Sequence, residues 1–361
     1  MKHFLGIEIG GTKLQLGLGL GQSGELRRLW REKIDPRSGA PRIREQIVAG
    51  YAAILDQAGL TADDIAGAGI AFGGPVDSDR GLTVKSHQVE GWDRFPLTDW
   101  CHEQLKLPTV LQNDADTAAY AEARFGAGQN FNPVMYLTIG SGIGGGLVLD
   151  GKIYRGAGSG AMEIGHLRPG QLPRHIPTCG ETVESIGSGF GITARARQAI
   201  SGYEDTLAFM RTHHRADPRA TGDDPDLAAK FNPARDRFAR LWEACGGNPE
   251  AITTQMIGEC AKLGDRLSLE LLADAAEVIG WGIAQAITLI NPARVVIGGG
   301  VSLLGDEMFL DPVRRACRNH VFGPFAGVAE IVPAALGEEV VIYGAVAVAA
   351  QAFQPSTTST E

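Results

Sequence analysis

The sequence lacks any run of apolar residues long enough to cross a bilayer. The longest apolar stretches, 283–290 and 343–350, fall far short of the roughly 20 residues that a membrane helix needs. The first residues pass straight into a strand-like run, without the basic start, apolar stretch and small-residue cleavage site of a secretory leader. We therefore expect a cytoplasmic protein with no membrane partner.

The sequence also has few cysteines and no excess of positive charge. The 361 residues include 5 cysteines without a close pair, which indicates neither a disulfide framework nor a zinc knuckle. The formal net charge of -9 provides no basic field for phosphates, so nucleic acid is not an expected partner. With 44% hydrophobic residues, the chain can still bury the core of two ordinary domains.

One pattern occurs twice in the chain. Residues 4–18 and 136–149 each read as an apolar strand, a glycine-rich turn and a second apolar strand. In the second copy, Asp150-Gly151 is a dipeptide favoured in a two-residue hairpin turn. We interpret the repeat as a duplicated domain. It predicts a small α/β lobe over 1–115, completed by a C-terminal helix over 343–353, and a larger α/β lobe over 116–342.

Helix and strand patterns alternate around these repeats. Helical spacing predicts helices over 43–55, 114–125 and 267–290, and short apolar runs predict strands over 65–72, 109–112 and 295–298. Asp114 therefore lies where a strand leads into a helix. The polar stretch 203–238 predicts an insertion, and the Ser- and Thr-rich tail 354–361 predicts disorder.

Three glycine-rich turns suit phosphate or nucleotide binding. Gly10-Gly11-Thr12-Lys13 combines unscreened backbone amides with a hydroxyl and an ammonium group. The turn Gly140-Ser141-Gly142-Ile143-Gly144-Gly145-Gly146 could hold a triphosphate from the opposite side, in a cleft between the lobes. Gly298-Gly299-Gly300 would admit a flat group such as adenine. Each turn alone is also compatible with a structural role, and none is a Walker A or Rossmann sequence.

A second group of polar residues suits a sugar and its phosphorylation. Asp114 could accept the proton of a sugar hydroxyl, and Asn113 can both donate and accept hydrogen bonds. Taken alone, this pair equally fits the start of a helix, where Asn and Asp serve as N-caps. Glu163, His166 and Glu184 add groups that can bind several hydroxyls, although a lone histidine is often a structural hydrogen-bond partner.

Together these motifs give the chain a resemblance to the ROK family of sugar kinases and regulators. The resemblance extends nearly end to end, and the combination of motifs is highly specific. It rests on GIEIGGTK at 6–13, FGGPVD at 72–77, QNDADTAAYAE at 112–122, IGSGIGGGLVLDGK at 139–152, EIGH at 163–166 and INPARVVIGGGVS at 290–302.

The resemblance implies a two-lobed α/β fold, the actin-like ATPase (ribonuclease H-like) fold, with the active site in the cleft between the lobes. It also implies Mg-ATP held by the glycine loops, Asp114 as the general base and Glu8 contacting Mg²⁺ through water. The residues implied to bind ATP and its phosphates are Gly10, Gly11, Thr12, Lys13, Gly140, Ser141, Gly142, Gly144, Gly145, Gly298, Gly299 and Gly300. Those implied to bind a hexose are Gly74, Asn113, Asp114, Glu163, His166 and Glu184.

Two departures from the family pattern lie on the sugar side. The residue before Glu163 is usually glycine and is Met162 here, a larger side chain that we expect to crowd the sugar. Similar proteins carry a CxCGxxGC zinc knuckle after the EIGH motif, whereas this chain keeps only Cys179-Gly180. One thiolate with His166 and His175 does not make the three-thiolate set of a closed zinc site, so we predict no structural zinc.

We therefore predict an ATP-dependent hexose kinase, glucokinase-like or fructokinase-like. One alternative is a transcriptional regulator of the same family, against which the acidic charge and the lack of a helix-turn-helix before residue 6 argue. Another is a catalytically idle sugar-binding protein, against which the retained Asp114 argues. The motifs leave open the sugar, its hydroxyl, polyphosphate as the donor and a homodimer.

Overall fold

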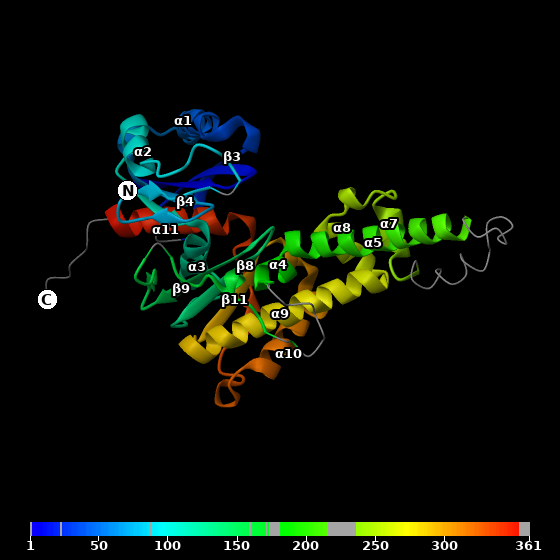
Figure 1. Cartoon of the computed structure of the whole chain (residues 1–361). Coiled ribbons are helices and arrows are strands. Elements are labelled where there is room, and N and C mark those ends of the chain that lie inside the picture. The colour runs from blue at the N-terminus through cyan, green and yellow to red at the C-terminus, as the bar shows by residue number, and fades with distance from the viewer. Residues whose placement is uncertain are drawn as a thin grey trace.

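The computed structural model describes residues 2–21, 24–86, 88–158, 160–170, 172, 181–215 and 236–353 (Figure 1). The predicted tail 354–361 and the cysteine at 179 lie outside the described residues. Among the described helices, none has both the length and the apolar character required to span a membrane.

The first lobe contains a five-stranded sheet with helices on both faces. The strand order is β3-β2-β1-β4-β7, with β1 antiparallel to β2 and parallel to β4. Its elements are β1 (His3–Ile9), β2 (Lys13–Gly19), β3 (Leu26–Lys33), α1 (Gly39–Ala58), β4 (Ile65–Phe72), β5 (Val76–Asp77), β6 (Leu82–Thr83), α2 (Leu97–Leu105) and β7 (Thr109–Asn113).

The second lobe repeats this topology. Its sheet order is β10-β9-β8-β11-β12, again with two antiparallel pairs followed by two parallel pairs. Its elements are α3 (Asp114–Phe125), β8 (Val134–Ile139), β9 (Ile143–Leu149), β10 (Lys152–Ile153), α4 (Val183–Gly187), α5 (Gly189–Arg215), α7 (Ala239–Ala244), α8 (Thr254–Lys262), α9 (Arg266–Ile290), β11 (Arg294–Gly298), α10 (Asp311–His320) and β12 (Glu330–Pro333). The two sheets thus share one strand order and one pattern of antiparallel and parallel pairs.

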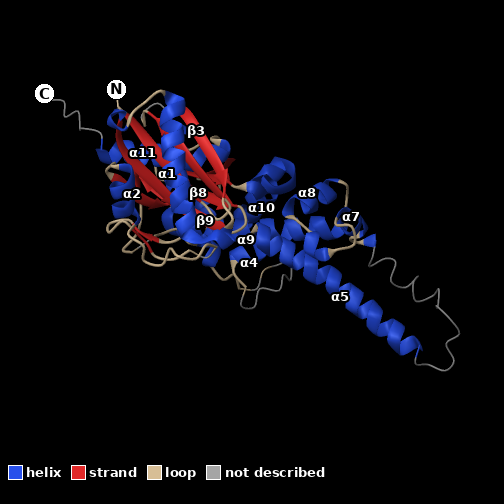
Figure 2. Ribbon diagram, turned by 90° about the horizontal axis from the view of Figure 1, so that it is seen from above, coloured by secondary structure: helices blue, strands red, loops and turns tan. Residues whose placement is uncertain are grey.

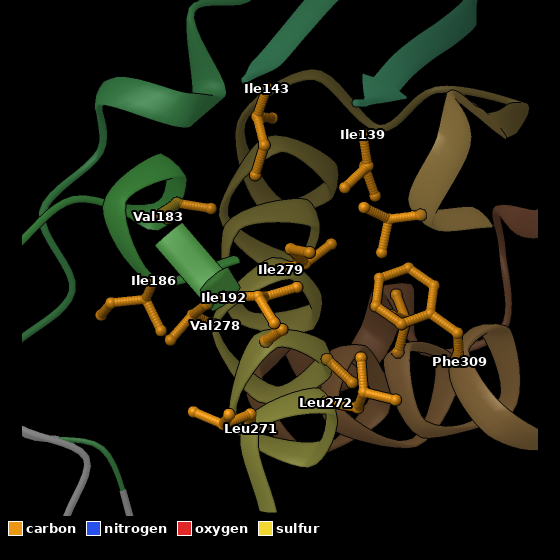
Figure 3. Packing of buried hydrophobic residues seen from close by; sticks show 14 of the residues in the cluster. Ile139, Ile143, Val183, Ile186, Ile192, Leu271, Leu272, Val278, Ile279 and Phe309 are labelled. Carbon is orange, nitrogen blue, oxygen red and sulfur yellow. The ribbon is translucent and has the colours of Figure 1, made fainter. Parts of the chain in front are cut away.

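Side chains alternate between the two faces of the second sheet. Ile139 and its neighbours at alternate positions of β8 face α9, and they form a core with residues of α4, α5 and the segment before α10 (Figure 3). Tyr136 points to the opposite face, which α3 covers. The β9–β10 turn uses Asp150 and Gly151 with φ of 51° and 70°, as expected for this hairpin dipeptide.

Helices α3 and α11 (Val340–Phe353) join the two lobes. α11 packs on β1 and β4 of the first sheet, on the face opposite α1 and α2, and also packs on α3 (Figure 1). The contact with α3 is very close, because a Cβ added to Gly344 would lie 2.0 Å from the Thr117 carbonyl oxygen. A Cβ on Gly69 of β4 would lie 2.1 Å from the Ala345 oxygen. Glycine at these positions lets α11 approach both the sheet and α3.

Two segments differ from the sequence prediction. α11 begins at Val340, whereas the pattern predicted a helix over 343–353. The predicted insertion 203–238 starts within α5, which continues to Arg215 and extends away from the sheets (Figure 2). At its other end, Phe238 is buried and contacts the ring of Tyr203 with centroids 5.1 Å apart. Residues 216–235 lie outside the described part of the chain.

Candidate active site

Two glycine turns, one in each lobe, present free backbone amides. In loop 1 (residues 10–13), the Gly10 amide donates to the Lys13 carbonyl and closes the turn. Within the described residues, the amides of Gly11 and Thr12 donate no hydrogen bond, and neither do those of Ser141 and Gly142 in loop 2 (residues 140–146). Unpaired amides grouped in a tight turn are the usual protein partners of phosphate oxygens.

Loop 2 is held in place by the helices that follow it. The amides of Gly189 and Phe190 at the start of α5 donate to the carbonyls of Gly140 and Ser141, at 2.8 and 3.1 Å. Glu184 of α4 accepts a hydrogen bond of 2.7 Å from the Ile143 amide through Oε2. The loop carbonyls are therefore turned toward the helices.

Gly299 brings the third glycine turn against the end of β8, directly before loop 2. It has φ of 88°, and an added Cβ would lie 2.5 Å from both the amide nitrogen and the carbonyl oxygen of Ile139. Only glycine fits both this conformation and this contact. Open space surrounds Gly140 and Gly300, where an added Cβ would meet nothing within 4 Å. The structure thus groups two of the three predicted glycine turns in the second lobe.

Asp114 is the first residue of α3, and the N-cap residue before it fixes where the helix begins. Asn113 is the N-cap: its Oδ1 accepts from the amides of Ala115 and Asp116, at 2.8 and 3.3 Å. Its Nδ2 donates to the Gly74 carbonyl at 3.1 Å. The capping role and the approach to Gly74 are therefore combined in one side chain. Asp114 Oδ1 accepts from the Ala115 amide at 2.9 Å, and Oδ2 faces Gly73, at 3.5 Å from the position of an added Cβ.

The surroundings of Asp114 favour its protonated form. Burial is the main cause that raises its pKa to about 6, and the charges of Glu8 and Glu163 raise it further. A carboxylate with a pKa close to neutral is well matched to accept a proton and is common among catalytic bases.

This environment predicts how activity depends on pH. Below a pH of about 6, Asp114 is protonated and cannot accept a proton, so kcat/KM should fall roughly tenfold per pH unit. The protonation of Asp114 would not itself unfold the protein: because its pKa is raised in the folded state, this group stabilises the fold more as pH falls from 7 toward 4. Initial rates from pH 4.5 to 8, with circular dichroism at each pH, test this. A flat kcat/KM across pH 6 would remove Asp114 as the base.

Glu8 lies beside Asp114 and is held by two partners on the neighbouring strand. Its Oε1 pairs with Lys13 Nζ at 3.4 Å, and its Oε2 accepts from Gln15 Nε2 at 2.5 Å. Burial is the largest cause of a raised Glu8 pKa. Mg²⁺ prefers carboxylate and water oxygens, and a cation near Glu8 and Asp114 would offset the repulsion that raises the pKa of Asp114. These residues fit a magnesium ion bound mainly through phosphate and water.

The predicted sugar-side residues of the second lobe lie on α4 and on a short helical turn, Ile164–His166, which Glu163 directly precedes. Glu163 and His166 are exposed, with Oε2 and Nε2 4.0 Å apart. Glu184 lies between this turn and loop 2, because an added Cβ on Gly165 would lie 3.4 Å from its Cβ. Met162 has φ of 63°, and its side chain packs against the core of the second lobe. That Met162 crowds a bound sugar stays a prediction.

The described residues contain no group of three or more His, Cys, Asp or Glu side chains placed to hold a metal. His175 and Cys179 lie outside them, so the absence of structural zinc stays a prediction.

Sequence reasoning missed two buried polar side chains near the site. Gln15 holds Glu8, and the hairpin register that pairs these two residues could have indicated it. Asp116 is buried on the first turn of α3 with no partner for Oδ1, and burial raises its pKa to about 7. Nothing in its sequence context separates it from an ordinary helix-start aspartate.

Two sheets of the same strand order, with α3 and α11 packed together between them, make this an α/β protein of the actin-like ATPase fold. The chain belongs to the ROK family, whose model matches residues 4–352.

Similar proteins cover from just over half to nearly all of the chain. A glucokinase of Halalkalibacterium halodurans is 27% identical over 348 residues, which are 95% of this chain and 93% of the relative. An N-acetylmannosamine kinase of Escherichia fergusonii is 35% identical over 211 residues, covering 57% of this chain and 68% of the relative. The crystal structure of a ROK glucokinase from Streptomyces griseus, in complex with glucose and AMPPNP, superposes with a TM-score of 0.73 at 27% identity. It covers 97% of this chain and 99% of that one.

Proposed function

We propose that this ROK-family protein is an ATP-dependent sugar kinase that phosphorylates a hexose hydroxyl, with Asp114 as the general base. One observation carries the proposal: Asp114, whose pKa is raised to about 6, lies within a fold that presents two turns of free amides. Phosphoryl transfer needs mainly positioning and charge stabilisation, which these groups supply. The similarity to a glucokinase bound to glucose and AMPPNP supports both substrates.

In the proposed reaction, the sugar hydroxyl oxygen forms a bond to the γ-phosphorus as the bond to the β–γ bridging oxygen breaks. Asp114 Oδ2 accepts the hydroxyl proton. The free amides of loop 1 and loop 2, with Lys13, bind phosphate oxygens. Glu8 would hold Mg²⁺ through water, and the ion would neutralise phosphate charge.

The hexose would lie beside Asp114, between the two lobes. Asn113 and the Gly74 backbone approach it from the first lobe, and Glu163, His166 and Glu184 approach it from the second. Because Glu184 also accepts the Ile143 amide, one of its oxygens remains for a sugar hydroxyl. The glycines at 298–300 would contact the adenine.

A coupled assay of ADP release tests the proposal. Purified protein with Mg-ATP is tested on glucose, fructose, mannose, N-acetylglucosamine and N-acetylmannosamine. We expect saturable turnover on one of the hexoses, with glucose first among them because of the glucokinase relatives. Polyphosphate replaces ATP in a parallel series. Folded protein that binds a sugar but turns over none with either donor would identify an idle sugar-binding protein instead.

A further inference from the structure

Gln88 lies directly over loop 1, although it is distant from that loop in the sequence. A Cβ added to Gly11 would lie 1.3 Å from Gln88 Oε1 and 2.3 Å from its Cδ. The carboxamide therefore occupies the space that any side chain at position 11 would fill. Gln88 is nevertheless exposed, and its side chain makes no hydrogen bond with any other described residue.

The residues that follow Gln88 anchor it to the first lobe. Val89 and Trp92 are buried in the core of the first lobe, where the Trp92 ring meets Phe72 edge to face at 5.6 Å. Ser86 Oγ accepts from the amides of Gln88 and Val89, at 3.3 and 3.1 Å. The Gln88 backbone is thus held by Ser86 and by the buried residues that follow it, and its free carboxamide lies over the turn.

The same segment also reaches the sugar side of the site. The Lys85 carbonyl lies 2.8 Å from the position of an added Cβ on Gly74. Gly10 in turn lies close to Gly73, with its Cα 3.6 Å from the added Cβ, and Asp114 Oδ2 lies 3.5 Å from that same point. Lys85 therefore lies against Gly74 and Gln88 against Gly11, on two sides of the carboxylate proposed as the base.

From this arrangement we infer that Gln88 is a further substrate-contacting residue, which donates a hydrogen bond from Nε2 to the γ-phosphate of the bound nucleotide. This inference rests on the proposed function. Gln88 Oε1 lies against Gly11, so the Nε2 group of the same planar amide is left to reach an oxygen ligand beside the loop. The γ-phosphate is the group that both the loop amides and Asp114 must approach during transfer.

Comparing two nucleotides tests the inference without requiring turnover. AMPPNP carries the γ-phosphate and ADP does not, so calorimetric titration of the magnesium complex of each isolates that contact. Gln88→Ala should weaken AMPPNP binding about 10-fold and leave ADP binding within about 2-fold, since a hydrogen bond to a charged oxygen is lost. Gln88→Glu should weaken AMPPNP binding further, because a carboxylate would face the phosphate. Gln57→Ala, at an exposed position of α1, is the matched control.

Three results would overturn the inference. Equal effects on ADP and AMPPNP would assign Gln88 to loop 1 packing, and a change in sugar affinity alone would assign it to the sugar. No change in either variant would make it a spectator. Kinase turnover is read separately: if the parent phosphorylates no sugar yet Gln88→Ala still discriminates the two nucleotides, the proposed function fails and the γ-phosphate contact stands.

Discussion

Asp114→Asn should abolish phosphoryl transfer while leaving sugar binding intact. The substitution preserves shape, and Oδ1 of the new amide can still accept from the Ala115 amide. What is lost is the ability to accept the hydroxyl proton, a contribution of about 10²–10⁴ in rate for a general base. We expect kcat to fall about 10³-fold in the ADP-release assay, and the sugar dissociation constant from calorimetry to change by less than about 3-fold.

Asp116→Asn is the matched control for this experiment. It removes a second buried carboxylate from the same helical turn, two residues away, whose pKa is also raised by burial. Because Asp116 is assigned no contact with substrate, its variant should keep the parent's rate within a few-fold. If Asp114→Asn turned over sugar as fast as Asp116→Asn, the base would have to be another group.

Gly344→Val should destabilise the protein severely. A Cβ at this position would lie 2.0 Å from the Thr117 oxygen and 2.8 Å from its carbonyl carbon, so α11 would have to move away from α3. Backbone atoms of a packed helix cannot give way as the end of a long side chain can. We expect a loss of about 3 kcal/mol or more in the free energy of unfolding, measured by urea titration.

Gly202→Ala controls for the general effect of replacing a helical glycine. Gly202 lies in α5, where an added Cβ would meet nothing within 4 Å. Alanine there should be neutral or stabilise the fold by up to about 1 kcal/mol. A Gly344→Val protein as stable as Gly202→Ala would mean that α3 and α11 are not in backbone contact.

Local patterns in the sequence were enough to predict the repeated hairpins and the position of Asp114. A glycine turn between apolar strands and an alanine-rich helix after Asn113 are each set by neighbouring residues. Contacts between distant segments left no such signal. Nothing near Gln88 indicates that it lies on Gly11, and the polar composition after Tyr203 hid the continuation of α5.

The packing of the Met162 side chain also could not be predicted from the sequence. Met162 replaces a residue that is usually glycine in the family, and it was expected to crowd the sugar. The backbone there has the left-handed conformation that glycine favours, and the methionine side chain packs against the core of the second lobe. The substitution could be read from the sequence, whereas the packing of the side chain could not.

The late position of α11 has a consequence for the order in which the protein can fold during synthesis. Strands β1 and β4 leave the ribosome long before α11, yet α11 is the helix that covers one face of their sheet. Until α11 has been synthesised, the face of the sheet on which it packs is exposed to solvent. The first lobe would therefore remain open, and exposed to wrong partners, until the second lobe has been made.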